Sequence, residues 1–166
     1  MHDSTEKDRP ELKFIADVNL GRLVTWMRIL GYDTQSDRGK ADRPLLRRAQ
    51  AEGRVVLTRK RGLADRQFAG SILVIASDRV PQQLDEVIGK FGLRPAPEMF
   101  FSRCLRCNLV LEKVVKGDVE SRVPEYVCQT TDDFRQCPQC RRVYWPGTHG
   151  ENARRLVMRR IPDRLL

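Results

Sequence analysis

The sequence lacks a long hydrophobic run. Its 166 residues contain nothing near the roughly 20 consecutive apolar residues that span a bilayer, so we predict no membrane partner. The first ten residues also lack the apolar segment of a secretory signal, and we therefore expect a cytoplasmic protein. Internal repeats and low-complexity segments are absent as well. Because apolar residues are spread along the chain, we expect a folded protein of one ordinary domain, or of one domain with a smaller companion.

Lysine is scarce in a chain that is otherwise strongly basic. Of the 31 basic residues, 24 are arginine and 7 are lysine, against 22 acidic residues, and the net charge is +9. Arginine has the planar fork that suits phosphate groups and stacking on bases. The charge therefore favours nucleic acid as a partner over an acidic membrane surface or a basic face that is merely solvated. Residues 102–166 carry 13 basic and 8 acidic residues (+5), whereas residues 1–101 carry 18 and 14 (+4), so the shorter part is more densely charged.

Short apolar runs alternate with amphipathic segments through the first part of the chain. The patterns predict strands at 13–18, 32–34, 55–58 and 71–76, helices at 20–30, 42–53 and 82–91, and a helical turn at 63–68. Strands separated by helices at this spacing indicate a three-layer α/β fold with a mainly parallel sheet. Prolines then mark a linker at 94–97.

These patterns divide the chain into four parts. We expect a flexible N-terminal segment at residues 1–12, an α/β domain at 13–97, a small cysteine-bearing domain at 98–150, and a basic, partly helical tail at 151–166. In parallel sheets the site lies at the carboxyl ends of the strands. The residues that fall at or just after the predicted strand ends include Asp17, Thr58, Lys60, Ser77 and Asp78.

Four of the five cysteines form two Cys-x-x-Cys pairs, Cys104 with Cys107 and Cys137 with Cys140. Two such turns that face each other complete a tetrahedral sulfur site for structural zinc. The segment between them is long enough for a hairpin of residues 109–115 with 119–127. Disulfides are the alternative, and the missing secretory signal argues against them. The fifth cysteine, Cys128, is expected to be a buried or free thiol.

Aromatic and basic residues follow the second cysteine pair. Trp145 and the arginines of the tail suit stacking on bases and contact with phosphates. The alternatives are that Trp145 packs in the core of the small domain and that the arginines form a solvated face. His149 is either a functional acid or base or, more commonly for a lone histidine, a structural residue. The candidate RNA-binding residues are Arg59, Arg61, Trp145, Arg154, Arg155, Arg159 and Arg160.

An ordered set of motifs runs through nearly all of residues 13–150. Its parts lie at residues 14–17, 20–21, 26–33, 42–46, 52–59, 83–84, 103–108 and 144–149. Together they resemble the Mut-seven C-terminal RNase domain family, in which a PIN-like fold is followed by a zinc ribbon. Each motif alone is weak, whereas the combined order is specific.

The resemblance implies a metal-dependent phosphodiesterase that acts on RNA. In such a fold, acidic residues at the strand ends gather Mg2+ or Mn2+, hard cations that take oxygen ligands. Asp17 and Asp42 match the first two acids of the pattern, and Thr58 matches the threonine that precedes the third. Lys60 stands where the family usually has an aspartate, and an ammonium group there opposes a divalent cation.

Three further carboxylates are weaker candidates to replace the missing ligand: Asp37, Asp65 and Asp78. The alternative for each is an exposed or capping carboxylate. Lys60 can instead hold a substrate phosphate through its ammonium group.

Three functional hypotheses follow. The first is a metal-dependent ribonuclease in which Asp17 and Asp42 hold the ion and Lys60 positions phosphate. The second is a catalytically impaired RNA-binding module that depends on the ribbon and the tail. The third is a protein-interaction adaptor that uses the ribbon and an apolar patch. None of them predicts an oligomeric state.

Overall fold

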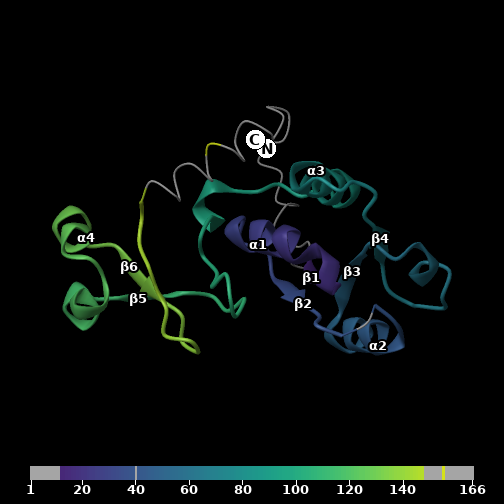
Figure 1. Ribbon diagram of the computed structural model, residues 1–166, viewed down its shortest axis with the longest axis horizontal. Coiled ribbons are helices and arrows are strands. Elements are labelled where there is room, and N and C mark those ends of the chain that lie inside the picture. Colours follow the sequence, from purple (N-terminus) through teal and green to yellow (C-terminus); the bar gives the residue numbers. More distant parts are fainter. Residues whose placement is uncertain (1–11, 40, 148–154, 156–166) are drawn as a thin grey trace, which may run out of the picture.

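The computed structural model describes residues 12–39, 41–147 and 155. Within them the chain forms a four-stranded sheet and a three-stranded sheet, which lie at different ends of the molecule (Figure 1). Most of the predicted N-terminal segment lies outside the described residues. The tail at 151–166 does so too apart from Arg155, and so do the candidate residues His149, Arg154, Arg159 and Arg160.

The four-stranded sheet is parallel throughout. In it β1 (Lys13–Ala16) lies between β2 (Thr34–Ser36) and β3 (Arg54–Thr58), and β4 (Ile72–Val74) lies beside β3. The chain passes from β1 to a neighbour on one side and then to a neighbour on the other, which places a topological switch point between β1 and β3. Ligands of open parallel sheets bind in the crevice at such a point.

Helices cover both faces of this sheet (Figure 1). α1 (Gly21–Ile29) and α3 (Val80–Phe91) share one core cluster with Phe14, whereas α2 (Arg43–Glu52) shares the other with Ile15. Neighbouring residues of a strand point to opposite faces, so β1 contributes to both clusters. The predicted three-layer α/β fold with a mainly parallel sheet is confirmed. No helix in the described part of the chain is long and apolar enough to cross a bilayer.

The end of α1 requires glycine at residue 31. Gly31 has a φ of 91°, and a Cβ there would lie 2.5 Å from the carbonyl oxygen of Met99. The N–H of Tyr32 still donates to the carbonyl of Met27 in α1, at 3.0 Å. The strand therefore begins at Thr34, two residues later than the pattern predicted.

The linker region packs directly on the α/β part. A 3-10 turn (Pro97–Met99) follows α3, and Phe100 lies in the same core cluster as α1 and α3. The N–H of Phe101 donates to the carbonyl of Ile29 at the end of α1, at 2.8 Å. The domain division near Pro97 stays a prediction, and the chain on either side of it shares one core.

The cysteine-bearing part is an antiparallel sheet with a helical insertion. β6 (Phe134–Gln136) pairs with both β5 (Glu112–Val114) and β7 (Val143–Tyr144). Between β5 and β6 lie two 3-10 turns (Lys116–Asp118 and Glu120–Arg122) and α4 (Glu125–Thr130). The predicted hairpin of 109–115 with 119–127 is therefore wrong in its second strand.

The insertion buries three valines, spaced four residues apart, against the antiparallel sheet. Val119, Val123 and Val127 are buried together against Phe134 of β6. Residues four apart share one face of a helix, but they also share one face of a strand, so this spacing alone does not distinguish the two. Elsewhere, the helical turn predicted at 63–68 begins earlier: a 3-10 turn after β3 spans Arg61–Leu63, and the N–H of Arg66 donates to the carbonyl of Leu63 at 3.3 Å.

Candidate functional site

Asp17 lies at the carboxyl end of β1, at the switch point of the parallel sheet, and is only 1% exposed. Its Oδ1 accepts a hydrogen bond from the N–H of Asn19, at 2.9 Å. Its Oδ2 accepts two, from Thr58 Oγ1 at 2.6 Å and from the N–H of Arg59 at 2.9 Å. Three donors offset the burial of this charge, and Oδ1 keeps one unused lone pair. The carboxylate thereby joins the ends of β1 and β3.

Lys60 lies at the same edge, directly after β3. Its N–H donates to Thr58 Oγ1, and its Nζ donates to the carbonyl of Ala41, each at 3.0 Å. The ammonium group therefore lies beside the residues that lead into α2. This brings a cation to the edge where the resemblance implies a third acid.

Asp42 comes directly before α2 and is surrounded by positive groups. The backbone N–H of Arg43 lowers the pKa of Asp42, and the charges of Arg66 and Lys60 act in the same direction. Oδ1 of Asp42 is shielded from solvent and accepts no hydrogen bond of good geometry. Its close partner is Arg66 Nη1, at 2.8 Å. Asp42 is thus engaged with a guanidinium group.

The residues at this edge do not fit a divalent cation as they stand. Mg2+ takes about six oxygen ligands in a near-octahedral arrangement. Asp17 offers one unused lone pair, Asp42 faces Arg66, and Lys60 adds an opposing charge. Among the described residues, the four paired cysteines are the one set of three or more such groups close enough to share an ion. The assignment of Mg2+ or Mn2+ to Asp17 and Asp42 stays a prediction.

The other residues predicted at this edge are dispersed. Arg59 forms an ion pair with Asp78, with 2.5 Å between Nη2 and Oδ1. Asp37 follows β2 and is partly buried, whereas Asp65 and Arg61 are exposed in the segment after β3. Arg59 is therefore held by a neighbouring carboxylate, while Arg61 remains open to solvent.

The sulfur atoms of the two Cys-x-x-Cys pairs form one cluster. All four, from Cys104, Cys107, Cys137 and Cys140, lie within 4.8 Å of one another, and those of Cys104 and Cys140 are 3.6 Å apart. Tetrahedral zinc with Zn–S bonds of about 2.3 Å places its sulfurs about 3.8 Å apart. The cluster thus has the size for one ion. Cys128 lies apart from it, near the carbonyl of Glu120.

Both pairs have the same backbone conformation. The residue that follows each pair, Asn108 or Arg141, has a positive φ (66° and 59°), and its N–H donates to the carbonyl of the first cysteine at 2.8 and 3.0 Å. In each pair the N–H of the second cysteine also points at the sulfur of the first, at 3.3 and 3.5 Å. Such hydrogen bonds favour the thiolate form that a metal ion requires.

Arg28 connects α1 to the first cysteine pair. Its side chain is buried, and it donates from Nε to the carbonyl of Thr34 at 2.9 Å. Its Nη1 donates to the carbonyls of Leu105 and Arg106, at 2.7 and 3.1 Å. Burial lowers the pKa of Arg28, and the nearby cysteine thiolates oppose this effect. Four thiolates around a divalent ion would leave a net negative charge, and the guanidinium group of Arg28 would compensate it.

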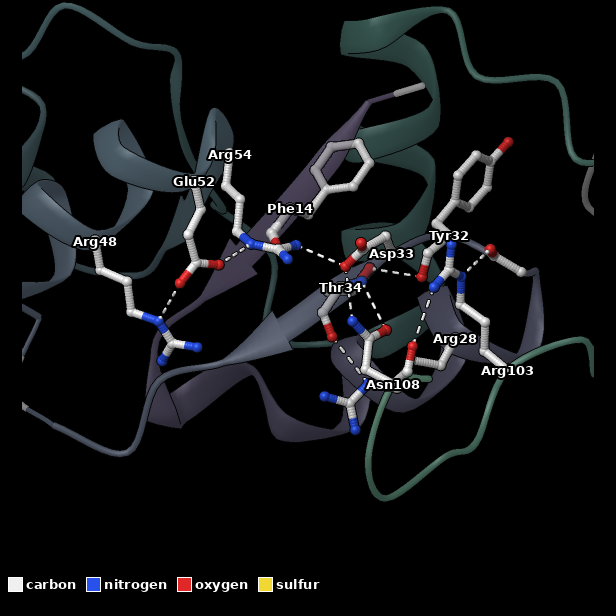
Figure 2. A network of polar contacts seen from close by, with 11 residues as sticks. Phe14, Arg28, Tyr32, Asp33, Thr34, Arg48, Glu52, Arg54, Arg103 and Asn108 are labelled. Atoms are coloured by element: carbon white, nitrogen blue, oxygen red, sulfur yellow. Dashed lines mark hydrogen bonds and ion pairs between the residues drawn. The ribbon is translucent and has the colours of Figure 1, made fainter. Parts of the chain in front are cut away.

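Asn108 makes a second connection, to the start of β2 (Figure 2). Its Oδ1 accepts from the N–H of Thr34 at 2.9 Å, and its Nδ2 donates to Asp33 Oδ1 at 2.7 Å. Arg54 Nη1 donates to the same oxygen of Asp33, at 2.6 Å. Arg103 adds a bond from Nε to the carbonyl of Gly31, at 2.8 Å. The cysteine cluster is therefore fastened to the edge of the parallel sheet.

Sequence reasoning assigned no role to this network. Five of its members lie inside the motifs that carry the family resemblance: Arg28, Asp33, Arg54, Arg103 and Asn108. A polar residue within such a motif, away from the expected site, was the signal that could have identified them.

A family model of the Mut7-C RNAse domain matches residues 12–157. The chain belongs to this family. The match spans the parallel sheet, the cysteine cluster and the network between them, so one family accounts for both parts of the molecule. Membership suggests a nuclease-like function and an interaction with RNA. No curated protein and no solved structure shows a significant match.

Trp145 of this Mut7-C chain follows β7 and is 38% exposed. It belongs to neither core cluster of the cysteine-bearing part within the described residues. Its role in stacking on bases stays a prediction. Arg155 is exposed too.

Asp33 gives the Mut7-C network a pH dependence. Burial alone would raise the pKa of Asp33, but hydrogen bonds from Arg54 and Asn108 outweigh it and hold this pKa below the ordinary value of 3.8. The stabilisation is thus complete above that value and is lost as the pH falls through the lower, folded-state pKa. We expect Asp33→Asn to destabilise the protein by about 1.5 kcal/mol at pH 7. The difference from the wild type is expected to shrink below about pH 4.

Urea unfolding at pH 7, 5, 4 and 3 measures this difference. Asp132→Asn is the control, because Asp132 pairs with Lys116 while its side chain is 86% exposed. An exposed pair contributes about 0–1 kcal/mol. An Asp33→Asn effect that stays constant from pH 7 to pH 3 would contradict the role of the ionised carboxylate.

Proposed function

We propose that this chain binds RNA at the carboxyl edge of its parallel sheet and that Lys60 contacts an RNA phosphate there. The observation that carries the proposal is the place of Lys60: its ammonium group lies beside the switch point, 3.0 Å from the carbonyl of Ala41. Membership in the Mut7-C RNase family supports RNA as the partner. The net charge of +9 supports an anionic ligand.

The geometry favours phosphate over a metal ion at this edge. A phosphate oxygen is attracted by the same ammonium group that repels a divalent cation. Arg66 and Arg61 lie in the segment that follows Lys60, and both carry the same sign of charge. The family fold is thus retained while the charge at the third acidic position is reversed.

The test is the affinity of Lys60→Gln for single-stranded RNA in the presence of chelator. We expect about fivefold weaker binding than the wild type and a salt dependence whose slope falls by about 1, because one phosphate contact is lost. Lys90→Gln is the matched control, since Lys90 is an exposed lysine in the last turn of α3. Equal affinity of the two variants over a salt titration would contradict the proposal.

Metal-dependent RNA hydrolysis is the second candidate. Two oxygens favour it: Asp17 Oδ1 keeps a lone pair, and Asp42 Oδ1, shielded from solvent, would be free to bind an ion once it parts from Arg66 Nη1, now 2.8 Å away. It requires that the wild type cleave RNA with Mn2+ and that chelator abolish cleavage. If instead only Lys60→Asp cleaves, the reversed charge is what blocks a divalent ion. A wild type that binds RNA and leaves it intact with Mn2+ excludes this candidate.

We further propose that the ion of the cysteine cluster is zinc. A closed set of four thiolates suits zinc or an iron–sulfur centre, and the sulfur separations given above match a single tetrahedral ion. With four protein ligands no position is left open for water, so the ion stabilises the fold and takes no part in a reaction.

A further inference from the structure

A cavity of about 660 Å3 opens between α2 and the segment that follows β3. On the α2 side it is lined by Arg43, Leu46, Arg47 and Gln50. These positions follow the i, i+3, i+4, i+7 spacing of one helix face. One face of α2 thus forms one wall of the cavity. The cavity lies on the side of the sheet opposite α1 and α3.

The opposite wall comes from three consecutive residues, Arg66, Gln67 and Phe68. Three arginines therefore line the cavity, and among the described residues no acidic side chain does. In the part of the chain that the structure describes, Arg43 and Arg47 form no salt bridge, while Arg66 pairs with Asp42. The cavity consequently attracts an anion.

Arg48, the next residue along α2, shows that, among the described residues, only one face of this helix carries arginines without a carboxylate partner. Arg48 follows Arg47 directly, but its guanidinium pairs with Glu52 at 2.8 Å and lies 3.6 Å from Asp37. Carboxylates thus neutralise Arg48, whereas the face with Arg43 and Arg47 keeps its positive charge. This difference gives a matched pair of adjacent arginines for experiment.

Phe68 supplies an aromatic wall of the cavity. It is partly buried and packs against the core cluster that contains Leu46. Glycine at residue 70 makes room for the ring, since a Cβ there would lie 2.5 Å from its Cε1 and Cζ. Aromatic rings stack on unpaired bases, and amide side chains such as those of Gln50 and Gln67 hydrogen-bond to base edges.

The cavity adjoins the carboxyl edge of the sheet. Arg66, in its wall, is 2.8 Å from Asp42, and Lys60 donates to Ala41, the residue before Asp42. An RNA strand whose phosphate lies at Lys60 would thus reach the cavity with an adjacent nucleotide. A volume of about 660 Å3 falls in the range of small-molecule sites.

We propose that this cavity binds one unpaired nucleotide of an RNA strand, with the base on Phe68 and phosphate oxygens at Arg43 and Arg47. The proposal rests on the proposed function, and it adds that the bound RNA is single-stranded next to Lys60. A paired base has both faces stacked in the duplex and its Watson–Crick edge occupied, so it cannot use the ring and the two glutamines.

The phosphate contact is tested with Arg47→Gln and with Arg48→Gln as its control. The probe is a fluorescently labelled oligouridylate, and the affinity is measured by anisotropy in chelator at fixed salt. We expect about fivefold to tenfold weaker binding for Arg47→Gln and less than twofold for Arg48→Gln. Equal losses in the two variants would overturn the assignment, because both remove one charge from the same turn of α2.

The base contact is tested with a second probe, an abasic ribose-phosphate oligomer of the same length and charge. The wild type is expected to prefer oligouridylate by about fivefold or more, the contribution of one stacked base. Phe68→Leu is expected to remove this preference, Phe68→Trp to keep it, and Arg47→Gln to weaken both probes alike. A preference that survives in Phe68→Leu would overturn the stacking role.

A wild type that binds neither probe contradicts the proposed function itself. Binding that is lost in Lys60→Gln but unchanged in Arg47→Gln and Phe68→Leu contradicts only the cavity. A labelled RNA hairpin without unpaired bases completes the set, because tighter binding of the duplex than of oligouridylate would exclude an unpaired nucleotide.

Discussion

Replacing Cys104 by serine is expected to abolish metal binding and to unfold the cysteine-bearing part of the protein. The thiolate of Cys104 is buried and lies 3.6 Å from that of Cys140. In small zinc modules the binding of the ion supplies about 10–16 kcal/mol of apparent free energy, so the loss of one ligand in four is expected to cost on the order of 3 kcal/mol or more.

The ion is expected to matter this much because the antiparallel sheet of this part is itself small. β5 and β6 are three residues each and β7 is two. Strands this short make few hydrogen bonds, and the core cluster formed by three valines and Phe134 is small. Below a certain core size, folded domains need a metal or disulfides. We expect an ion held by the cysteine cluster to supply that constraint here.

Two measurements check the expectation. Metal content by mass spectrometry or a colorimetric zinc assay is expected to fall from about one ion per chain to none, and thermal unfolding is expected to begin at a lower temperature. Cys128→Ser is the control, because Cys128 lies outside the cluster. A Cys104→Ser variant that kept a full equivalent of zinc would show that the ion is held elsewhere.

Replacing Arg28 by methionine is expected to destabilise the whole molecule by about 3 kcal/mol or more. Methionine retains an apolar stem of similar length, so the change removes the charge and the donors rather than the packing. Three carbonyl groups, those of Thr34, Leu105 and Arg106, would lose their donor. The negative charge of the cysteine cluster would also lose its buried counter-charge.

The matched control for Arg28→Met is Arg22→Met. Both arginines lie in α1, but Arg22 is exposed, so its replacement is expected to change stability by no more than about 0.5 kcal/mol. Urea unfolding measures the cost. The rate at which a chelator removes zinc provides a second readout, which is expected to rise in Arg28→Met and to stay unchanged in Arg22→Met. Equal zinc release would mean that Arg28 is structural only and does not compensate the cluster.

The sequence patterns that predicted the structure correctly depend only on residues close together in the chain. β1 and β3 are continuous apolar runs because both of their faces are covered, and α2 lies between Asp42 and Gly53, as its cap residues predict. The Cys-x-x-Cys spacing places two sulfurs on one turn wherever that turn lies. These features need no knowledge of distant residues.

Local patterns failed where one spacing fits both a helix and a strand. The apolar residues from Val119 to Val127 were interpreted as a strand, but they lie in the insertion with α4, and residues four apart share one face in either element. In the same way, a strand was expected at residue 32, but Gly31 and Tyr32 still complete the end of α1. In the first case tertiary packing decides which element forms, and in the second the end of α1 decides where the strand begins.

The sequence alone determined the three-layer α/β fold, the two Cys-x-x-Cys pairs and the place of a lysine, Lys60, directly after β3, because each depends on residue type and short spacing. Only the tertiary structure decided that Arg28 and Asn108 fasten the cysteine cluster to the sheet and that α2 forms an arginine-lined cavity with Phe68. Those contacts join residues as far apart as Arg28 and Leu105, whose proximity follows from packing and has no periodic trace in the chain.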